Sequence, residues 1–265
     1  MIASLPMYDW PEHRGVTDRL WRLIASALRD RGISVPDRLD RESDLNATWL
    51  RPDLLVSQTC GLPYVRRLGK RVRLVGAVDH GIGDLPGGLY CSRIIVRTDD
   101  PARTLADLRA RRAAFNAGDS QSGAGALRHM VLPLVRNAGF FGETLATGGH
   151  VASIRAVAEG RADTAAIDAA TWELALRHLP ETAGLRVLLS TPPTPGLPLI
   201  TACDGPAEAL FAATNAALTA MSLAERQTLL FHRLLPRTPS DFDIVAQWDA
   251  EAGVAGYREL HQGSA

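Results

Sequence analysis

Two kinds of apolar pattern alternate along the chain. Short runs rich in Val, Ile and Leu predict strands, and apolar residues spaced three and four apart predict helices. The clearest helical stripe comprises Leu20, Trp21, Ile24 and Leu28 and ends at Gly32, a typical helix stop. The predicted strands are 2–5, 54–57, 72–78, 90–96, 113–116, 164–168, 185–189 and 200–203, and the predicted helices are 62–68, 101–110, 151–159, 170–178 and most of the chain after residue 203.

This alternation predicts an α/β fold with mostly parallel, doubly wound sheets. The strand 90–96 and the proline-rich segment 191–198 bracket a middle portion that has βα units of its own. We therefore predict two doubly wound α/β lobes joined by two crossing segments. Residues 1–91 and 190–265 form lobe one, which is discontinuous, and residues 92–189 form lobe two. Ligands of such folds lie at the carboxyl ends of strands, here in a cleft between the lobes.

Composition narrows the classes of function. The 265 residues include 29 Lys and Arg against 29 Asp and Glu, so no net charge attracts nucleic acid or an acidic membrane surface. Three widely spaced cysteines without a Cys-x-x-Cys pair predict neither a zinc site nor a disulfide framework. We expect a monomer that needs no metal and no cofactor.

The N-terminal residues bear on localisation. They lack the basic segment followed by an apolar core that a secretory signal needs. No run approaches the roughly 20 apolar residues of a membrane span. As written, the sequence predicts a cytoplasmic protein; if the start is trimmed or misassigned, it predicts a periplasmic one.

The turn after the strand 113–116 carries the strongest candidate chemistry. Ser120, Gln121, Ser122 and Gly123 connect that strand to a predicted helix. A helix N-terminus presents unpaired N–H groups and a positive dipole end, and the two hydroxyls add donors, which together suit an anion. The alternative is a plain helix cap, because Ser is a favoured N-cap residue. The apolar stripe of the helix is Leu127, Met130, Val131, Leu134 and Val135.

A second turn of this kind follows in the same lobe. Gly148 and Gly149 precede His150, which opens the next predicted helix, so an imidazole stands where it can donate to an anion. Asp168 ends the strand 164–168, where it would either hold an amino group of a ligand or cap the following helix. The sequence leaves both roles of Asp168 open.

Lobe one offers two weaker candidates. Tyr8 follows the first strand and would either line the ligand or cover the core. Cys60 lies in the strand-to-helix turn 58–61, which would add donors to the site. A thiol nucleophile is one interpretation of Cys60, and a buried inert cysteine is the commoner one. The sequence has no Walker A, Gly-x-Gly-x-x-Gly or Gly-x-Ser-x-Gly pattern, so it indicates binding more strongly than catalysis.

Three motifs resemble those of the phosphate- and phosphonate-binding proteins of ABC transporters. They are Ser120-Gln121-Ser122-Gly123, then Thr147-Gly148-Gly149-His150 with Ser153, and then Gly160-Arg161-Ala162-Asp163 followed by Asp168. The resemblance covers roughly residues 1–200. It implies a type II periplasmic-binding-protein fold, a small oxyanion ligand and an ABC permease as partner.

The resemblance also implies roles for individual residues. The hydroxyl turn and the histidine would grip a phosphonate or phosphate, the acidic residue would meet an amino group of the ligand, and an aromatic residue would follow the first strand. Gln121 departs from the small hydroxyl residue that is commoner at its position, so the polar head of the ligand would differ. The implied residues are Tyr8, Ser120, Gln121, Ser122, His150 and Asp168.

We therefore expect a solute-binding protein that closes over a small oxyanion. We assign no catalytic residue. Donation from a charged His150 would add roughly 1.5–3 kcal/mol. The alternative is a cytoplasmic enzyme or sensor on the same fold that acts on a small organic acid. Cys60, His150 or Asp168 would then be the reacting group.

Overall fold

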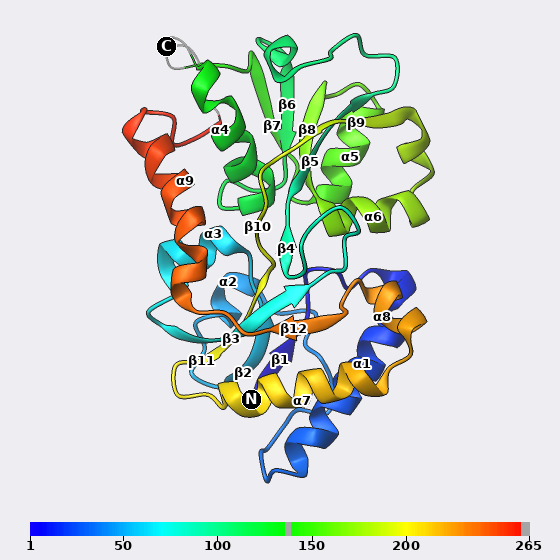
Figure 1. Ribbon diagram of the computed structural model, residues 1–265, viewed down its shortest axis with the longest axis vertical. Helices are drawn as coiled ribbons and strands as arrows, with labels where there is room; N and C mark the ends of the chain where they lie inside the picture. The colour runs from blue at the N-terminus through cyan, green and yellow to red at the C-terminus, as the bar shows by residue number, and fades with distance from the viewer. Residues whose placement is uncertain (136–138, 261–265) are drawn as a thin grey trace. The chain divides into compact units, whose positions relative to one another are not determined.

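The chain divides into two compact units, each with its own five-stranded sheet (Figure 1). The computed structural model describes residues 1–135 and 139–260. Unit 1 comprises Met1–Leu89 and Pro195–Asp243, and unit 2 comprises Tyr90–Thr194 and the segment from Ile244 onward. The chain therefore passes between the units three times, after Leu89, after Thr194 and after Asp243.

The third passage corrects the expected composition of lobe one. We expected the whole of 190–265 to belong there, but the segment from Ile244 belongs to unit 2. Helix α9 (Asp243–Val254) starts at the boundary, and Tyr257 and Leu260 join the apolar core of unit 2. An apolar stripe shows that a helix covers a core, but it does not show which core, so periodicity could not assign this segment.

The sheet of unit 1 has the order β1-β2-β11-β3-β12. Strands β1 and β2 are parallel, β11 is antiparallel to β2 and β3, and β12 is antiparallel to β3. Strand β12 lies in a part of the chain that was expected to be helical. The strands are β1 (Ile2–Ser4), β2 (Leu54–Gln58), β3 (Val72–Asp79), β11 (Pro198–Ala202) and β12 (Arg233–Leu235).

The sheet of unit 2 has the order β7-β6-β8-β5-β9. Strands β6, β7 and β8 are parallel, and β5 is antiparallel to β8 and β9. Strand β7 was not expected from the sequence. The strands are β5 (Ser92–Arg97), β6 (Arg112–Phe115), β7 (Glu143–Ala146), β8 (Thr164–Asp168) and β9 (Leu185–Ser190).

Both sheets are mixed, but most of their strands share one direction, namely β1, β2 and β3 in unit 1 and β6, β7, β8 and β9 in unit 2. The expected α/β fold therefore holds, and the antiparallel strands β5, β11 and β12 were not predicted. Neighbouring parallel strands need a crossover connection, usually a helix, whereas antiparallel strands do not. Strands β5 and β11 each follow directly after the chain has passed into their unit, so no crossover within that unit sets their direction. A short two-stranded sheet pairs β4 (Leu89–Tyr90) with β10 (Thr194–Pro195).

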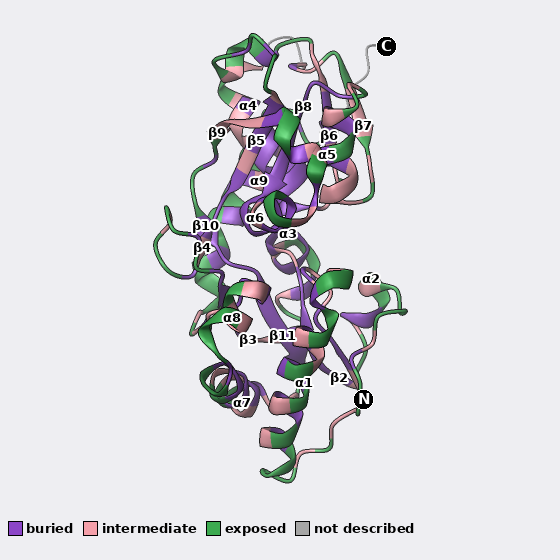
Figure 2. Cartoon of the chain, turned by 90° about the vertical axis from the view of Figure 1, so that its right-hand side faces the viewer, coloured by how far each residue is buried: buried purple, intermediate pink, exposed green. Residues whose placement is uncertain are grey.

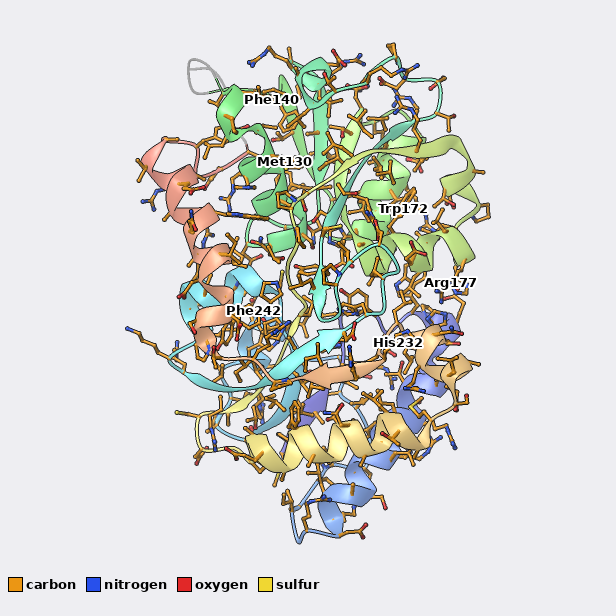
Figure 3. All side chains as sticks on the ribbon, viewed as in Figure 1. Met130, Phe140, Trp172, Arg177, His232 and Phe242 are labelled. Atoms are coloured by element: carbon orange, nitrogen blue, oxygen red, sulfur yellow. The ribbon has the colours of Figure 1, made fainter. Side chains whose placement is uncertain are left out.

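The core of unit 1 confirms the clearest helical prediction. Helix α1 (Arg14–Arg29) buries Leu20, Trp21, Ile24 and Leu28, each at most 3% exposed. Figure 2 shows the buried strands at the centre of each unit. Phe242, near the start of α9 in Figure 3, packs edge-on against Tyr64 with ring centroids 5.0 Å apart. The remaining helices of unit 1 are α2 (Leu45–Thr48), α3 (Gly61–Pro63), a π-helical segment (Tyr64–Leu68), α7 (Ala207–Ala220), α8 (Leu223–Leu229) and two 3-10 turns (Pro11–His13 and Pro239–Phe242).

Two helices of unit 2 are shorter than the sequence indicated, whereas the helices predicted at 151–159 and 170–178 form at nearly those bounds. The expected helix 101–110 is reduced to a 3-10 turn, Leu105–Leu108, which starts after the extended residue Thr104 and cannot continue through Ala110, whose φ is 59°. Of the stripe that begins at Leu127, Leu127 and Val131 are fully buried and Met130, labelled in Figure 3, is half-buried. The other helices are a π-helical segment (Gln121–Gly125), α4 (Ala126–Val131), α5 (His150–Ala158), α6 (Ala169–His178) and two 3-10 turns (Leu132–Leu134 and Pro180–Gly184). Among the described residues, no helix combines the length and apolar character that a membrane crossing needs.

Gly196 offers a test of the packing in unit 1. A Cβ at this position would lie 2.1 Å from the carbonyl oxygen of Val78, which is a backbone atom that cannot swing away. We expect Gly196→Ala to lower the free energy of unfolding by about 1–3 kcal/mol, as overpacked substitutions do, measured by chemical denaturation. Gly184→Ala is the control, since a Cβ there has no neighbour within 4 Å, and its effect should stay within about 0.5 kcal/mol. Equal effects of the two substitutions would contradict the prediction.

Candidate functional site

Three parallel strands of unit 2 end at the same edge of the sheet. The registers of β6 with β7 and with β8 place their carboxyl ends side by side. Polar residues stand at each of these ends: Asn116 follows β6, Thr147 follows β7, and Asp168 is the last residue of β8. The amide of Gly148 donates to the carbonyl oxygen of Asn116 over 2.9 Å, so the two turns that open helices are joined through the backbone.

The first turn contains both a helix cap and a candidate ligand contact. Ser120 is the N-cap, and its Oγ accepts from the amide of Gly123 at 3.1 Å. The amide of Gly125 donates to the carbonyl of Ser120 at 2.9 Å, which gives the first helical turn its π-type spacing. The cap interpretation therefore holds for Ser120, whereas Ser122 makes a different contact.

Ser122 and His150 connect the two helix starts. The distance from Ser122 Oγ to His150 Nε2 is 2.9 Å, and Asn116 Nδ2 lies 3.4 Å from the same ring nitrogen. The position of Asn116 also explains why residue 123 is a glycine, because a Cβ at Gly123 would lie 1.9 Å from Asn116 Oδ1. The structure thus brings together Asn116, Ser122 and His150 at the start of two helices.

The imidazole of His150 lies in a buried setting. Its Nδ1 is inaccessible to solvent and has no hydrogen bond of normal geometry among the described residues. Burial lowers the pKa of His150, and the nearby Asp168 carboxylate and Ala166 carbonyl oppose this shift only in part. The charged imidazole that was expected from the sequence is therefore disfavoured, because burial penalises the charged form. The periodicity of the sequence could not reveal this burial.

Asp168 performs the capping role that the sequence left open. Its carboxylate accepts from the amide of Thr171 at 2.8 Å and so caps α6, the helix that carries Trp172 in Figure 3. The side chain is buried, with 3% of the residue exposed, and its charge acts on His150. A carboxylate that caps one helix and faces an imidazole adds acceptors to this edge of the sheet.

Tyr8 and Cys60 lie in unit 1. Tyr8 is buried and meets His80 edge-on, with ring centroids 4.9 Å apart. Gln58 Oε1 accepts from the amide of Met7 at 3.3 Å, which joins the turns after β1 and β2. Cys60 is half-buried at the N-cap of α3 and forms no side-chain cap. Their roles toward a ligand remain predictions.

Asn116 is a residue of this site that was not predicted from the sequence. Its signal was the same as that of Asp168, a polar residue at the carboxyl end of a buried strand, but it was read as part of the strand. We define the unit 2 cluster as Asn116, Ser120, Gln121, Ser122, His150 and Asp168. None of these side chains carries a permanent positive charge, and among the described residues no group of His, Cys, Asp and Glu could hold a metal ion.

Two α/β units with mixed sheets, one of them bearing a polar cluster at two helix starts, define a solute-binding protein of the type II periplasmic-binding-protein fold. The family model described as ABC transporter, phosphonate, periplasmic substrate-binding protein matches residues 62–239, and the chain belongs to this family. None of the curated proteins matches the sequence.

Solved structures of similar proteins support the fold. PhnD1 from Prochlorococcus marinus in complex with methylphosphonate matches with a TM-score of 0.70 and 17% identity, over 95% of this chain and 98% of its own. A binding protein component of an ABC phosphonate transporter from Pseudomonas aeruginosa matches with a TM-score of 0.70 and 14% identity, over 96% of this chain and 87% of its own. XAC2383 from Xanthomonas citri bound to chloride ion matches with a TM-score of 0.69 and 15% identity, over 97% of this chain and 98% of its own.

Family membership has three consequences for the expectations from sequence. The resemblance and the type II fold are confirmed. The role is solute binding and not catalysis, so the enzyme alternative is set aside. The family is normally periplasmic and works with an ABC permease and a small ligand.

Proposed function

We propose that this protein binds phosphate or a small phosphonate at the unit 2 cluster and delivers it to an ABC permease. The observation that carries the proposal is the 2.9 Å contact between Ser122 Oγ and His150 Nε2, which joins the N-termini of two helices. Each helix start contributes backbone N–H groups and a positive dipole end, so two such starts together suit a tetrahedral oxyanion with several acceptor oxygens.

The two helix starts would contribute in different ways. Helix α5 begins after Gly149 without a side-chain cap, which leaves its first turn open to an external acceptor. The first turn that follows Ser120 is capped by that residue's own Oγ, so the neighbouring backbone N–H groups would supply the donors there. A neutral set of donors of this kind can hold an anion without Lys or Arg.

The comparisons support phosphorus chemistry in the ligand. The family is described by its phosphonate substrate, and PhnD1 of similar fold was solved with methylphosphonate. XAC2383, also of similar fold, was solved with chloride and with ATP, so simple anions and nucleotides belong among the competitors to test. A monomer would suffice for this role.

A ligand panel tests the proposal. Thermal unfolding is measured with phosphate, phosphite, methylphosphonate, sulfate, acetate, chloride and ATP, because a ligand that binds only the folded protein stabilises it, by about 2.7 kcal/mol at 100 times its Kd. We expect the largest rise in Tm with phosphate, phosphite or methylphosphonate, followed by calorimetry for the Kd. A rise with acetate or ATP, and none with phosphate, phosphite or methylphosphonate, would contradict the proposal.

A further inference from the structure

The donor and acceptor roles in the hydrogen bonds around His150 determine which oxyanion the unit 2 cluster can bind. An amide nitrogen can only donate, so Asn116 Nδ2, 3.4 Å from His150 Nε2, requires a lone pair on that ring nitrogen. The proton of the neutral imidazole is then on Nδ1.

Ser122 takes its polarity from the same ring nitrogen. Because Nε2 carries a lone pair, the Ser122 hydroxyl donates its proton to it across 2.9 Å. The hydroxyl then presents lone pairs, and no proton, to any ligand that reaches it. Ser122 is therefore a hydrogen-bond acceptor in this arrangement, although a serine at a helix start would ordinarily count as a donor to an anion.

Asn116 adds a second acceptor. Its Oδ1 is buried and has no hydrogen-bond donor among the described residues, which is uncommon for a buried carbonyl oxygen. It occupies the space that a side chain at Gly123 would need, so it lies against the first turn of the helix. The Asp168 carboxylate at the end of β8 is also acceptor-only when ionised. The cluster thus presents hydrogen-bond acceptors to which an anion without a proton cannot donate.

We propose that the unit 2 cluster selects an oxyanion that still carries a proton, with Asn116 as the residue that determines this specificity. The proposal rests on the proposed function and names the form of the ligand. The backbone N–H groups of the two helix starts hold the ionised oxygens, and the P–OH group of a hydrogenphosphonate or hydrogenphosphate donates to Asn116 Oδ1 or Ser122 Oγ. Sulfate and alkylsulfonates, which carry no proton, leave those acceptors unpaired and bind weakly.

Methylphosphonate and methanesulfonate test the proposal, because they are similar in shape and only the first retains a proton at mildly acidic pH. Calorimetry with the full chain should show that methylphosphonate binds more tightly by at least about tenfold, the effect of one unsatisfied buried group. In Asn116→Leu, which keeps the size but removes the acceptor, the ratio should fall to within about threefold. Asn116→Asp, which keeps an acceptor, should retain the preference. Thermal unfolding establishes that each variant is folded.

Each other outcome has a distinct meaning. If Asn116→Leu weakens both ligands equally, the amide donates to the ligand and the proposal is wrong. If the unsubstituted protein binds both ligands equally well, the proposal is wrong and the proposed function stands. If neither ligand nor phosphate binds, the proposed function fails and takes this inference with it. If Asn116→Leu does not fold, the 15N NMR chemical shifts of the His150 ring nitrogens test the proposal in the unsubstituted protein. A proton on Nδ1 is the expected result, and a proton on Nε2 would overturn the proposal.

Discussion

Replacing His150 by Ala should weaken methylphosphonate binding by about tenfold while the protein remains folded. The ring nitrogen Nε2 holds the Ser122 hydroxyl at 2.9 Å and lies 3.4 Å from the Asn116 amide, so the substitution frees both side chains. Two neutral hydrogen bonds at about 0.5–1.5 kcal/mol each correspond to a loss of this size. Calorimetry of the variant and of the unsubstituted protein measures the ratio of the two Kd values.

The control is a second histidine of unit 2 that has no part in the cluster. His129 stacks on Trp248 with ring centroids 3.8 Å apart and an angle of 7° between the planes. His129→Ala should reduce stability and leave the Kd for methylphosphonate unchanged. If both substitutions lower affinity equally, the effect comes from a general loosening of unit 2, and His150 has no place in the site.

Replacing Tyr257 by Ala should lower the free energy of unfolding by about 3–5 kcal/mol, the usual cost of truncating a buried aromatic side chain. Tyr257 is 1% exposed and belongs to the apolar core of unit 2 together with Leu127 and Val131. The segment that carries Tyr257 is also held by Arg128, which donates to the carbonyl of Arg258 and forms an ion pair with Asp249 at 3.3 Å. Chemical denaturation measures the loss.

Tyr257→Phe is the matched control, because it removes only the hydroxyl. That hydroxyl is buried and has no hydrogen-bond partner among the described residues, so its loss should change stability by less than about 1 kcal/mol. A loss as large as that of Tyr257→Ala would show that the hydroxyl, and not the packed ring, holds the segment.

The same pair of variants predicts a dependence on alkaline pH. Burial raises the pKa of Tyr257 to about 12, while an unfolded tyrosine ionises near 10. Above pH of about 10 the unfolded chain loses a proton that the folded protein retains, so stability falls as pH rises. Tyr257→Phe should show a smaller fall between about pH 10 and 12 than the unsubstituted protein in denaturation measured at each pH.

Much of the fold could be predicted because its signals are local. The apolar stripe of α1 was predicted correctly because it depends only on a spacing of three and four along the chain. The turn 120–123 was identified because hydroxyl residues are favoured at the N-cap of a helix. Strand β7 was missed because only two of its four residues are apolar and both of its ends are exposed, and β12 was missed because its apolar residues were assigned to the C-terminal helices. The antiparallel setting of β5 and β11 was missed because strand direction depends on partners far away in the sequence.

The candidate site divides in the same way. From the sequence by itself came the polar residues at the carboxyl ends of strands and at helix starts, since these follow from capping and from the order of elements. Only the tertiary structure placed Ser122 against His150, 28 residues apart in the chain, and placed Asn116 over Gly123. It also decided that burial disfavours the charged form of His150 and that the segment from Ile244 belongs to unit 2. Burial and long-range contacts arise when distant segments pack together, and a periodic pattern carries no information about which segments those are.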